Sequence, residues 1–176
     1  MYQFSQREHE NKHEGSMRPL KTKYIRMKIE EEIKQFVFKS IYQKALINIL
    51  YTASWINLRQ MQVFKKFGLT PAQYNVLRIL RGQYPKVVTV NLINDRMLDK
   101  SSNGSRIVEK LRVKKLVERV TCSEDRRAVN VVIATGGLDL LNEIDKIEME
   151  LSTGVNKLTQ AEASLLNDLL DKIRQE

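Results

Sequence analysis

Apolar residues recur at helical spacing along most of this chain, with strand-like sequence in between. Residues 29–67 contain no glycine or proline, and their apolar positions fall on one helix face. Residues 138–147 and 160–173 show the same spacing, and Thr159 with Glu162 predicts a capping box at the start of the second of these segments. The pattern predicts a mainly α-helical protein with a small β-hairpin. The apolar positions in these segments are Ile33, Phe36, Val37, Ile41, Ala45, Ile49, Ala53, Ile56, Phe64, Leu138, Leu141, Ile144, Ile147, Leu165, Leu166, Leu169, Leu170 and Ile173.

A shorter helix is predicted directly after Gly68, which ends the first helical run. Thr70 and Gln73 have the spacing of a capping box, and Pro71 stands at the first helical position. This helix is expected to stop at Gly82. Its apolar residues, which are expected to belong to the core, are Tyr74, Leu77 and Leu80.

Two helices separated by a short turn are predicted between residues 89 and 111. Thr89 is a good N-cap for the first, which runs to Met97, and the second begins around Ser101. The small or apolar residues of the second helix form one buried face: Gly104, Ile107, Val108 and Leu111. Its open face carries Ser102, Asn103, Ser105, Arg106, Glu109 and Lys110.

That open face has two interpretations. Short hydrogen-bonding side chains near the helix start and cations further along suit a recognition helix in the DNA major groove, where they contact base edges and phosphates. A solvated helix face has a similar composition, and the helix alone does not separate the two.

The next segment favours DNA binding. Residues 117–122 and 128–133 are rich in β-branched residues, and the five polar residues between them suit a hairpin tip. A helix-turn-helix followed by a hairpin is a winged helix. Arg126 and Arg127 at the tip can enter an adjacent minor groove, whose negative potential attracts arginine. Our hypothesis for Asp125 is that its carboxylate orients an arginine of the wing or of the recognition helix.

Three stretches together resemble the MarR family of bacterial transcriptional regulators: residues 69–77, the Ser-Arg-Ile-Val-Glu-Lys-Leu run at 105–111, and the Asp-Arg-Arg tip at 125–127. The resemblance implies a homodimer that binds double-stranded DNA at a pseudo-palindromic operator, usually represses, and is often released by a small ligand or by oxidation. Ser102, Asn103, Ser105 and Arg106 fall where the family contacts DNA, and Arg127 falls on its wing arginine. The full set of residues predicted to bind DNA is Thr89, Lys100, Ser101, Ser102, Asn103, Ser105, Arg106, Lys110, Arg126 and Arg127.

The chain departs from the family pattern at three places. Lys115 replaces the glycine that usually ends the recognition helix, so this helix is expected to end without glycine's easy left-handed conformation. Gly104 replaces an alanine or valine in mid-helix, at a cost of about 1 kcal/mol in helix propensity. Ala134 stands where many members have threonine, and Thr135 is expected to cap the next helix instead.

Charge is distributed unevenly along the chain, whose net charge is +9. Residues 96–127 carry ten Lys and Arg against five Asp and Glu, whereas residues 139–176 carry four against nine. The basic middle suits phosphate, and the acidic end suits protein or water. Residues 1–28 are polar and basic and lack a signal-peptide pattern, which predicts a flexible basic arm.

The expected organisation is therefore an arm at 1–28, a winged helix-turn-helix DNA-binding domain at 69–137, and a helical dimerisation region at 29–68 and 138–176. The last helix is apolar on more than one face, which favours a second subunit as its partner. Packing on the long first helix of the same chain is the alternative. The residues predicted at the dimer interface are Ile41, Ile49, Leu165, Leu166, Leu169, Leu170 and Ile173.

Two motifs outside this scheme carry little weight. His9 and His13 with Glu10 match the H-E-x-x-H pattern of zinc proteases, but the surrounding residues are polar and the chain has no third histidine, so we expect no metal site. Cys122 is the only cysteine, which excludes an intrachain disulfide and indicates a reducing cytoplasm. It is interpreted as a small apolar filler, with a redox switch as the alternative.

Neither a catalytic set nor a phosphate-binding glycine loop is present, so the chain is not expected to be an enzyme or to need a cofactor. The longest apolar stretch, residues 45–58, is too short and too polar to span a membrane, which predicts a soluble protein. The predicted function is ligand-responsive transcriptional regulation, with Tyr51, Trp55 and Tyr74 able to line an effector cleft. The alternative is a winged helix that binds an acidic protein partner.

Overall fold

The computed structural model describes residues 28–121, 129–147, 151–152 and 154–175. The chain forms two compact units, Met1–Lys44 and Ala45–Glu176. Across the described residues, no helix combines the length and the apolar character needed to cross a membrane.

The first unit contains the short helix α1 (Ile29–Glu32) and the first residues of α2 (Ile41–Lys65). The single helical run expected from residue 29 is wrong here, because Lys34 adopts a left-handed backbone conformation with φ of 54°. The amide of Gln35 then donates to the carbonyl of Glu30, which ends α1. The hydroxyl of Ser40 accepts the amide of Gln43 at 3.1 Å at the start of α2.

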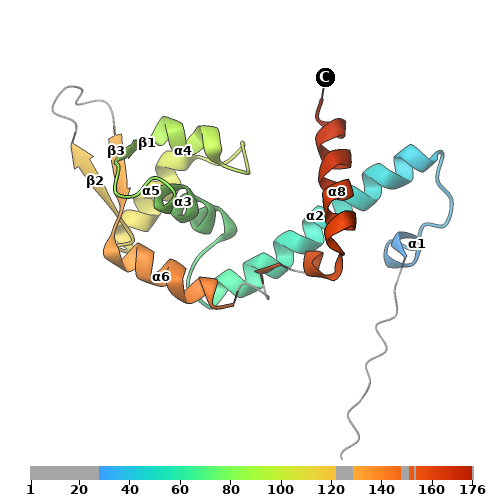
Figure 1. Cartoon of the computed structure of the whole chain (residues 1–176), viewed down its shortest axis with the longest axis horizontal. Helices are drawn as coiled ribbons and strands as arrows, with labels where there is room; N and C mark the ends of the chain where they lie inside the picture. Colours follow the sequence, from blue (N-terminus) through green and yellow to red (C-terminus); the bar gives the residue numbers. More distant parts are fainter. Residues whose placement is uncertain (1–27, 122–128, 148–150, 153, 176) are drawn as a thin grey trace, which may run out of the picture. The chain divides into compact units, whose positions relative to one another are not determined.

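The second unit contains the remainder of α2 and a winged helix. The winged helix comprises α3 (Pro71–Arg81), α4 (Val90–Arg96) and α5 (Gly104–Val113), with strands β1 (Val88–Thr89), β2 (Val117–Thr121) and β3 (Val129–Ile133). The strands pair antiparallel in the order β1-β3-β2, with Val88 opposite Val131 and Val117 opposite Ile133. Figure 1 shows the three helices gathered beside this sheet. The predicted mainly α-helical fold with a small hairpin is confirmed, with β1 as an additional strand that the sequence pattern did not indicate.

The core of the second unit lies where α3, α4 and α5 meet the sheet. Leu77 of α3, Ile93 of α4, and Val108 and Leu111 of α5 are fully buried, as is Val131 of β3. Phe64 in the last turn of α2 joins this cluster and stacks on Tyr74, with ring centroids 4.3 Å apart. Burial of these side chains supplies the main favourable contribution to folding.

The helix starts follow the capping residues that the sequence predicts at α3 and at α8 (Gln160–Ile173). Thr70 and Gln73 form the capping box of α3, and Thr159 and Glu162 form that of α8. A short 3₁₀ helix, η1 (Val155–Lys157), precedes α8.

The predicted cap of α6 (Thr135–Asp145) is wrong. Ala134 occupies the N-cap position without a side-chain cap, and Thr135 is already helical. The amide of Ala134 donates to the carbonyl of Leu116 at 3.0 Å, so the N-cap position falls on Ala134, which has no hydroxyl, and Thr135 comes one residue too late to cap.

Candidate nucleic-acid interface

The predicted recognition helix corresponds to α5, but it starts later than the sequence suggests. Asn103 is its N-cap, and the Oδ1 atom of Asn103 accepts the amide of Arg106 at 3.0 Å. Ser101 and Ser102 therefore lie in the turn before the helix, so the expected start near Ser101 is wrong. Gly104 occupies the first helical position. The full cost of glycine in helix propensity applies only in the middle of a helix, so it does not apply here.

The turn before α5 is held by a carboxylate. Asp99 accepts the hydroxyls of Ser101 and Ser102, each at 2.7 Å, and the amide of Ser101 at 3.0 Å. The pKa of Asp99 is lowered from its ordinary value, because these hydrogen bonds stabilise the carboxylate. The largest contribution comes from the Ser101 hydroxyl, followed by the Ser102 hydroxyl and the Ser101 amide. Both hydroxyls are thus oriented before any partner binds.

Two other predicted contact residues also have partners within the protein. The ammonium group of Lys100 donates to the carbonyls of Asn94 and Asp95 at the end of α4, where a cation is favoured. The hydroxyl of Thr89 accepts the amide of Leu92 at 3.2 Å and so caps α4, as predicted.

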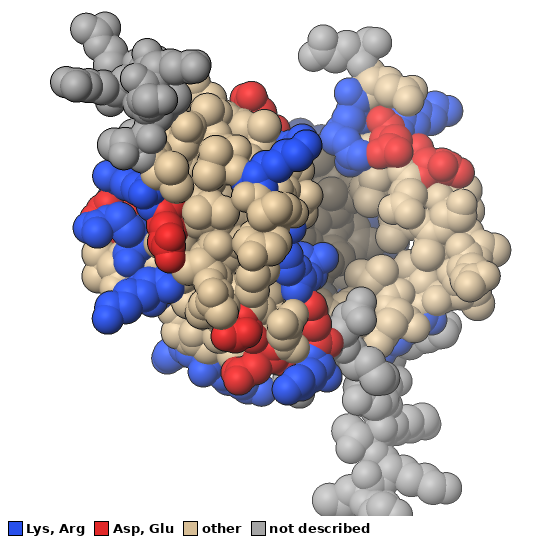
Figure 2. All heavy atoms as spheres, turned by 60° about the vertical axis from the view of Figure 1, so that its left-hand side comes forward, with Lys and Arg blue, Asp and Glu red and all other residues tan. Residues whose placement is uncertain are grey.

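The remaining predicted residues of α5 are open to solvent. Ser105, Arg106 and Lys110 are exposed, and their side chains have no hydrogen bond or ion pair with the described residues. Figure 2 shows basic side chains spread over the side of the winged helix that faces the viewer, with acidic groups among them. The helix therefore presents uncompensated cations and a hydroxyl beside its capped N-terminus.

The C-terminus of α5 has the geometry that glycine usually supplies. Lys115 adopts φ of 59°, and its amide donates to the carbonyl of Arg112 at 2.8 Å. The amide of Leu116 donates to the carbonyl of Leu111 at 3.0 Å, which completes a Schellman motif. The expectation that the helix ends without a left-handed residue is therefore wrong, because Lys115 takes that conformation itself.

Lys115→Gly is expected to stabilise the protein by about 1 kcal/mol, because a side chain in the left-handed region carries a steric cost. The melting temperature should rise by about 2–4 °C. Lys146→Gly is the matched control, since Lys146 is an exposed helix C-cap with φ of −65°. A thermal melt in which Lys115→Gly does not exceed the wild type would contradict the assignment of strain to this position.

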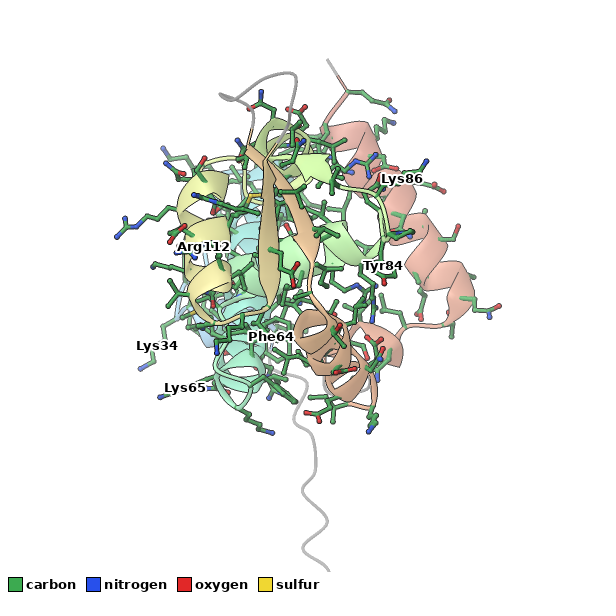
Figure 3. All side chains as sticks on the ribbon, turned by 90° about the vertical axis from the view of Figure 1, so that its left-hand side faces the viewer. Lys34, Phe64, Lys65, Tyr84, Lys86 and Arg112 are labelled. Carbon is green, nitrogen blue, oxygen red and sulfur yellow. The ribbon has the colours of Figure 1, made fainter. Side chains whose placement is uncertain are left out.

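Glu109 connects α5 to the wing. Its carboxylate pairs with Arg112 at 2.8 Å and with Arg119 of β2 at 3.3 Å. The hydrogen bond from Arg112 lowers the pKa of Glu109 from its ordinary value. These groups line an open groove of about 870 Å³ between helix and strand. In Figure 3, Arg112 projects from the outer side of the molecule, whereas Phe64 lies in its interior.

Lys114 fixes the other end of the recognition helix, a role that the sequence pattern did not indicate. Its ammonium group donates to the carbonyl of Gly68 and to Oε1 of Gln73, the latter at 3.2 Å. Gln73 is buried and also belongs to the capping box of α3. One lysine thus joins α5 to the junction between α2 and α3.

A pocket of about 470 Å³ lies between α2, α3 and the turn before α5. Among the described residues that line it, Asp99 is the only charged one, and Tyr74 is the only one of the three predicted cleft aromatics. Trp55 instead carries Arg59 over its ring, 4.6 Å from the centroid. The lining residues are Asn57, Gln60, Met61, Phe64, Thr70, Pro71, Ala72, Tyr74, Asn75, Met97, Leu98 and Asp99.

The residues predicted at a dimer interface are mostly exposed. Ile41 is 77% exposed, and Leu165, Leu169 and Ile173 of α8 are 58%, 50% and 65% exposed. Ile49 and Leu166 are also exposed, and Leu170 is half-buried. The predictions for Asp125, Arg126, Arg127, Cys122 and the histidine motif at 9–13 lie outside the described residues.

The helix-turn-helix, the three-stranded sheet and the exposed face of α5 define a winged helix-turn-helix protein. Residues 67–128 match the model of the MarR family. The transcriptional regulator MhqR of Bacillus subtilis is 28% identical over 121 residues, which are 67% of this chain and 81% of that protein. In sequence and in fold, the chain is similar to the MarR family of transcriptional regulators.

Solved structures of the same family share the fold. A MarR transcription factor from Planctomyces limnophilus is 27% identical with a TM-score of 0.59, covering 77% of this chain and 98% of that one. A MarR-like regulator from Bacillus cereus is 17% identical with a TM-score of 0.66, covering 76% and 95%. A mutant of MarR from E. coli, complexed with operator DNA, is 21% identical with a TM-score of 0.63, covering 85% and 100%.

Proposed function

We propose that this protein binds double-stranded DNA as a homodimer at a pseudo-palindromic operator, represses transcription there, and is released by a small-molecule ligand. The observation that carries the proposal is the exposed face of α5. Ser105, Arg106 and Lys110 on this face are exposed and have no partners among the described residues, and Asn103 caps the helix start. The MarR structure with operator DNA, which shares the fold, supports this use of the surface.

The proposed contacts divide by chemistry. Ser105 and Arg106 in the first turn of α5 are placed to contact base edges in the major groove, since recognition helices read bases with their N-terminal residues. Lys110 lies further along and contacts phosphate. The polar residues of the turns position the protein on the backbone: Thr89, Lys100, Ser101, Ser102 and Asn103. Arg126 and Arg127, oriented by Asp125, are proposed to enter the minor groove.

The dimer is proposed from the apolar surface of α8 and α2. Helix α8 exposes large apolar side chains at helical spacing, namely Leu165, Leu169 and Ile173. On α2, the side chain of Ile41 is exposed as well. Large apolar side chains that stay in water are unfavourable, and burial against a second copy removes them from water. A two-fold dimer also places two recognition helices on two half-sites.

The proposed effector site is the pocket of about 470 Å³ beside Asp99. Because Asp99 is the only charged residue among its described lining residues, the pocket favours a neutral or cationic ligand with hydrogen-bond donors over an anion. A ligand that donates to Asp99 competes with the hydroxyls of Ser101 and Ser102, which supports release of DNA through the turn before α5. The related regulator BpsR of Bordetella bronchiseptica is regulated in DNA binding by 6-hydroxynicotinic acid.

The alternative function is binding of an acidic protein partner by the same basic surface. The two functions differ in how the affinity for duplex DNA depends on salt concentration and on DNA sequence. Fluorescence anisotropy of the full chain with a labelled duplex from its own promoter, and with a scrambled duplex, measures both. Operator binding predicts a specific affinity at least about 1,000-fold above the non-specific one and a steep loss of affinity as salt rises. Equal affinity for both duplexes would contradict the proposed function.

A further inference from the structure

The two helices of the helix-turn-helix are joined by one hydrogen bond at the start of α5. The amide of Gly104 donates to Oδ1 of Asn94, on α4, at 3.1 Å. The first amides of a helix have no partner within the helix, and Gly104 is buried, so this amide needs an acceptor from elsewhere. Asn94 supplies that acceptor from the neighbouring helix.

Glycine at position 104 is what allows this contact. A Cβ built on Gly104 would lie 2.2 Å from Oδ1 and 3.2 Å from Cγ of Asn94. The Asn94 side chain is the part that would yield, because its amide group is the end of a rotatable side chain. Any larger residue at 104 therefore displaces Asn94 and leaves the amide of residue 104 without its acceptor.

The contact acts on the part of α5 that carries the proposed base-reading residues. Asn103 caps the amide of Arg106 from within the turn, whereas Asn94 caps the amide of Gly104 from α4. The second cap ties the direction of the helix start to another rigid element. Arg106 follows Gly104 by two residues, so a change in this direction moves its side chain relative to a base edge.

We propose that Asn94 is a positioning residue which, through the amide of Gly104, fixes the start of α5 against α4 and thereby sets the preference for operator over other DNA. The inference rests on the proposed function. Attraction between Lys or Arg and phosphate does not depend on the direction of the helix start, so non-specific binding is independent of this contact.

The first test is Gly104→Ala. Helix propensity and displacement of Asn94 predict opposite changes in the affinity for the operator. Helix propensity alone predicts a more stable protein and unchanged or tighter binding. Displacement of Asn94 predicts that affinity for an operator duplex enriched from a random pool falls by about three- to tenfold, the effect of one lost hydrogen bond. Affinity for a scrambled duplex stays at the wild-type value. Gly136→Ala is the matched control, since its Cβ would meet only the carbonyl of Lys115 at an ordinary 3.5 Å.

Asn94→Ala and the double variant, which carries both substitutions, complete a double-mutant cycle with Gly104→Ala and the wild type. Once Asn94 is alanine, the methyl group at position 104 displaces nothing, so the double variant should bind the operator as well as Asn94→Ala alone or better. Thermal melts of the same four proteins without DNA should show the same non-additivity. Additive effects in the melts, or wild-type operator preference in Gly104→Ala, would overturn the proposal. A wild type that prefers no duplex would contradict the proposed function instead, and the melts would still decide the role of Asn94.

Discussion

Gly137→Ala is expected to destabilise the protein by about 3 kcal/mol or more, because the new methyl group has no space and its main obstacle is backbone. A Cβ on Gly137 would lie 2.3 Å from the carbonyl oxygen of Leu116 and 2.8 Å from Cγ1 of Ile133. That carbonyl already accepts the amide of Ala134 at 3.0 Å, so it cannot move without breaking the junction between the sheet and α6.

The measurement is a chemical or thermal unfolding curve, in which the melting temperature should fall by roughly 6–12 °C. The control is the adjacent Gly136→Ala, whose Cβ makes only an ordinary contact and whose helical position favours alanine. If both variants melt alike, the close approach of α6 to the start of β2 is not the constraint that the structure indicates.

Arg106→Ala is expected to weaken operator binding by about 1–3 kcal/mol, or roughly 5- to 150-fold, and to relax specificity at one base position. The reason is its place in the first turn of α5, where the side chain is exposed and has no partner among the described residues. Its guanidinium is free to make two parallel hydrogen bonds to a guanine edge.

Arg112→Ala is the matched control on the same helix. Its guanidinium is held by Glu109 at 2.8 Å, so it is not available to the DNA in the same way, and its removal should cost much less. Affinities for operator and scrambled duplexes at fixed salt give the loss of operator affinity and the loss of specificity. A loss in Arg106→Ala that is equal on both duplexes would indicate a phosphate contact, and no loss would remove Arg106 from the interface.

The helix starts were predictable where a side chain caps the backbone locally. Thr70, Thr89 and Thr159 each accept the amide three residues later, and each marks the start of a helix in the structure as in the sequence. Such caps depend only on neighbouring residues, so the sequence pattern contains the information.

The start of α5 was not predictable in this way, because its caps are divided between two segments. Asn103 acts locally, but the acceptor for Gly104 comes from Asn94, ten residues earlier in the chain. The serines that looked like the first residues of the helix are bound to Asp99 instead. Strand β1 was missed for a related reason, since it has two residues and depends on pairing with β3.

The left-handed residues illustrate a different limit. Gly68 has φ of 66° at the end of α2, as glycine at a helix end suggests, but Lys34 and Lys115 adopt the same conformation without being glycine. At Lys115 the surrounding bonds of the Schellman motif impose it. The sequence shows where a left-handed conformation has a low steric cost, namely at glycine, but it does not show where the structure requires that conformation.

Selection of bound sequences from a random duplex pool by the wild-type protein tests the central claim most directly. Binding of two α5 helices related by two-fold symmetry predicts an enriched inverted repeat, whose half-sites are centred about one helical turn, or ~10 bp, apart. Enrichment of no sequence, or of a single half-site without its inverted partner, would contradict the account of a dimer that reads DNA with this helix.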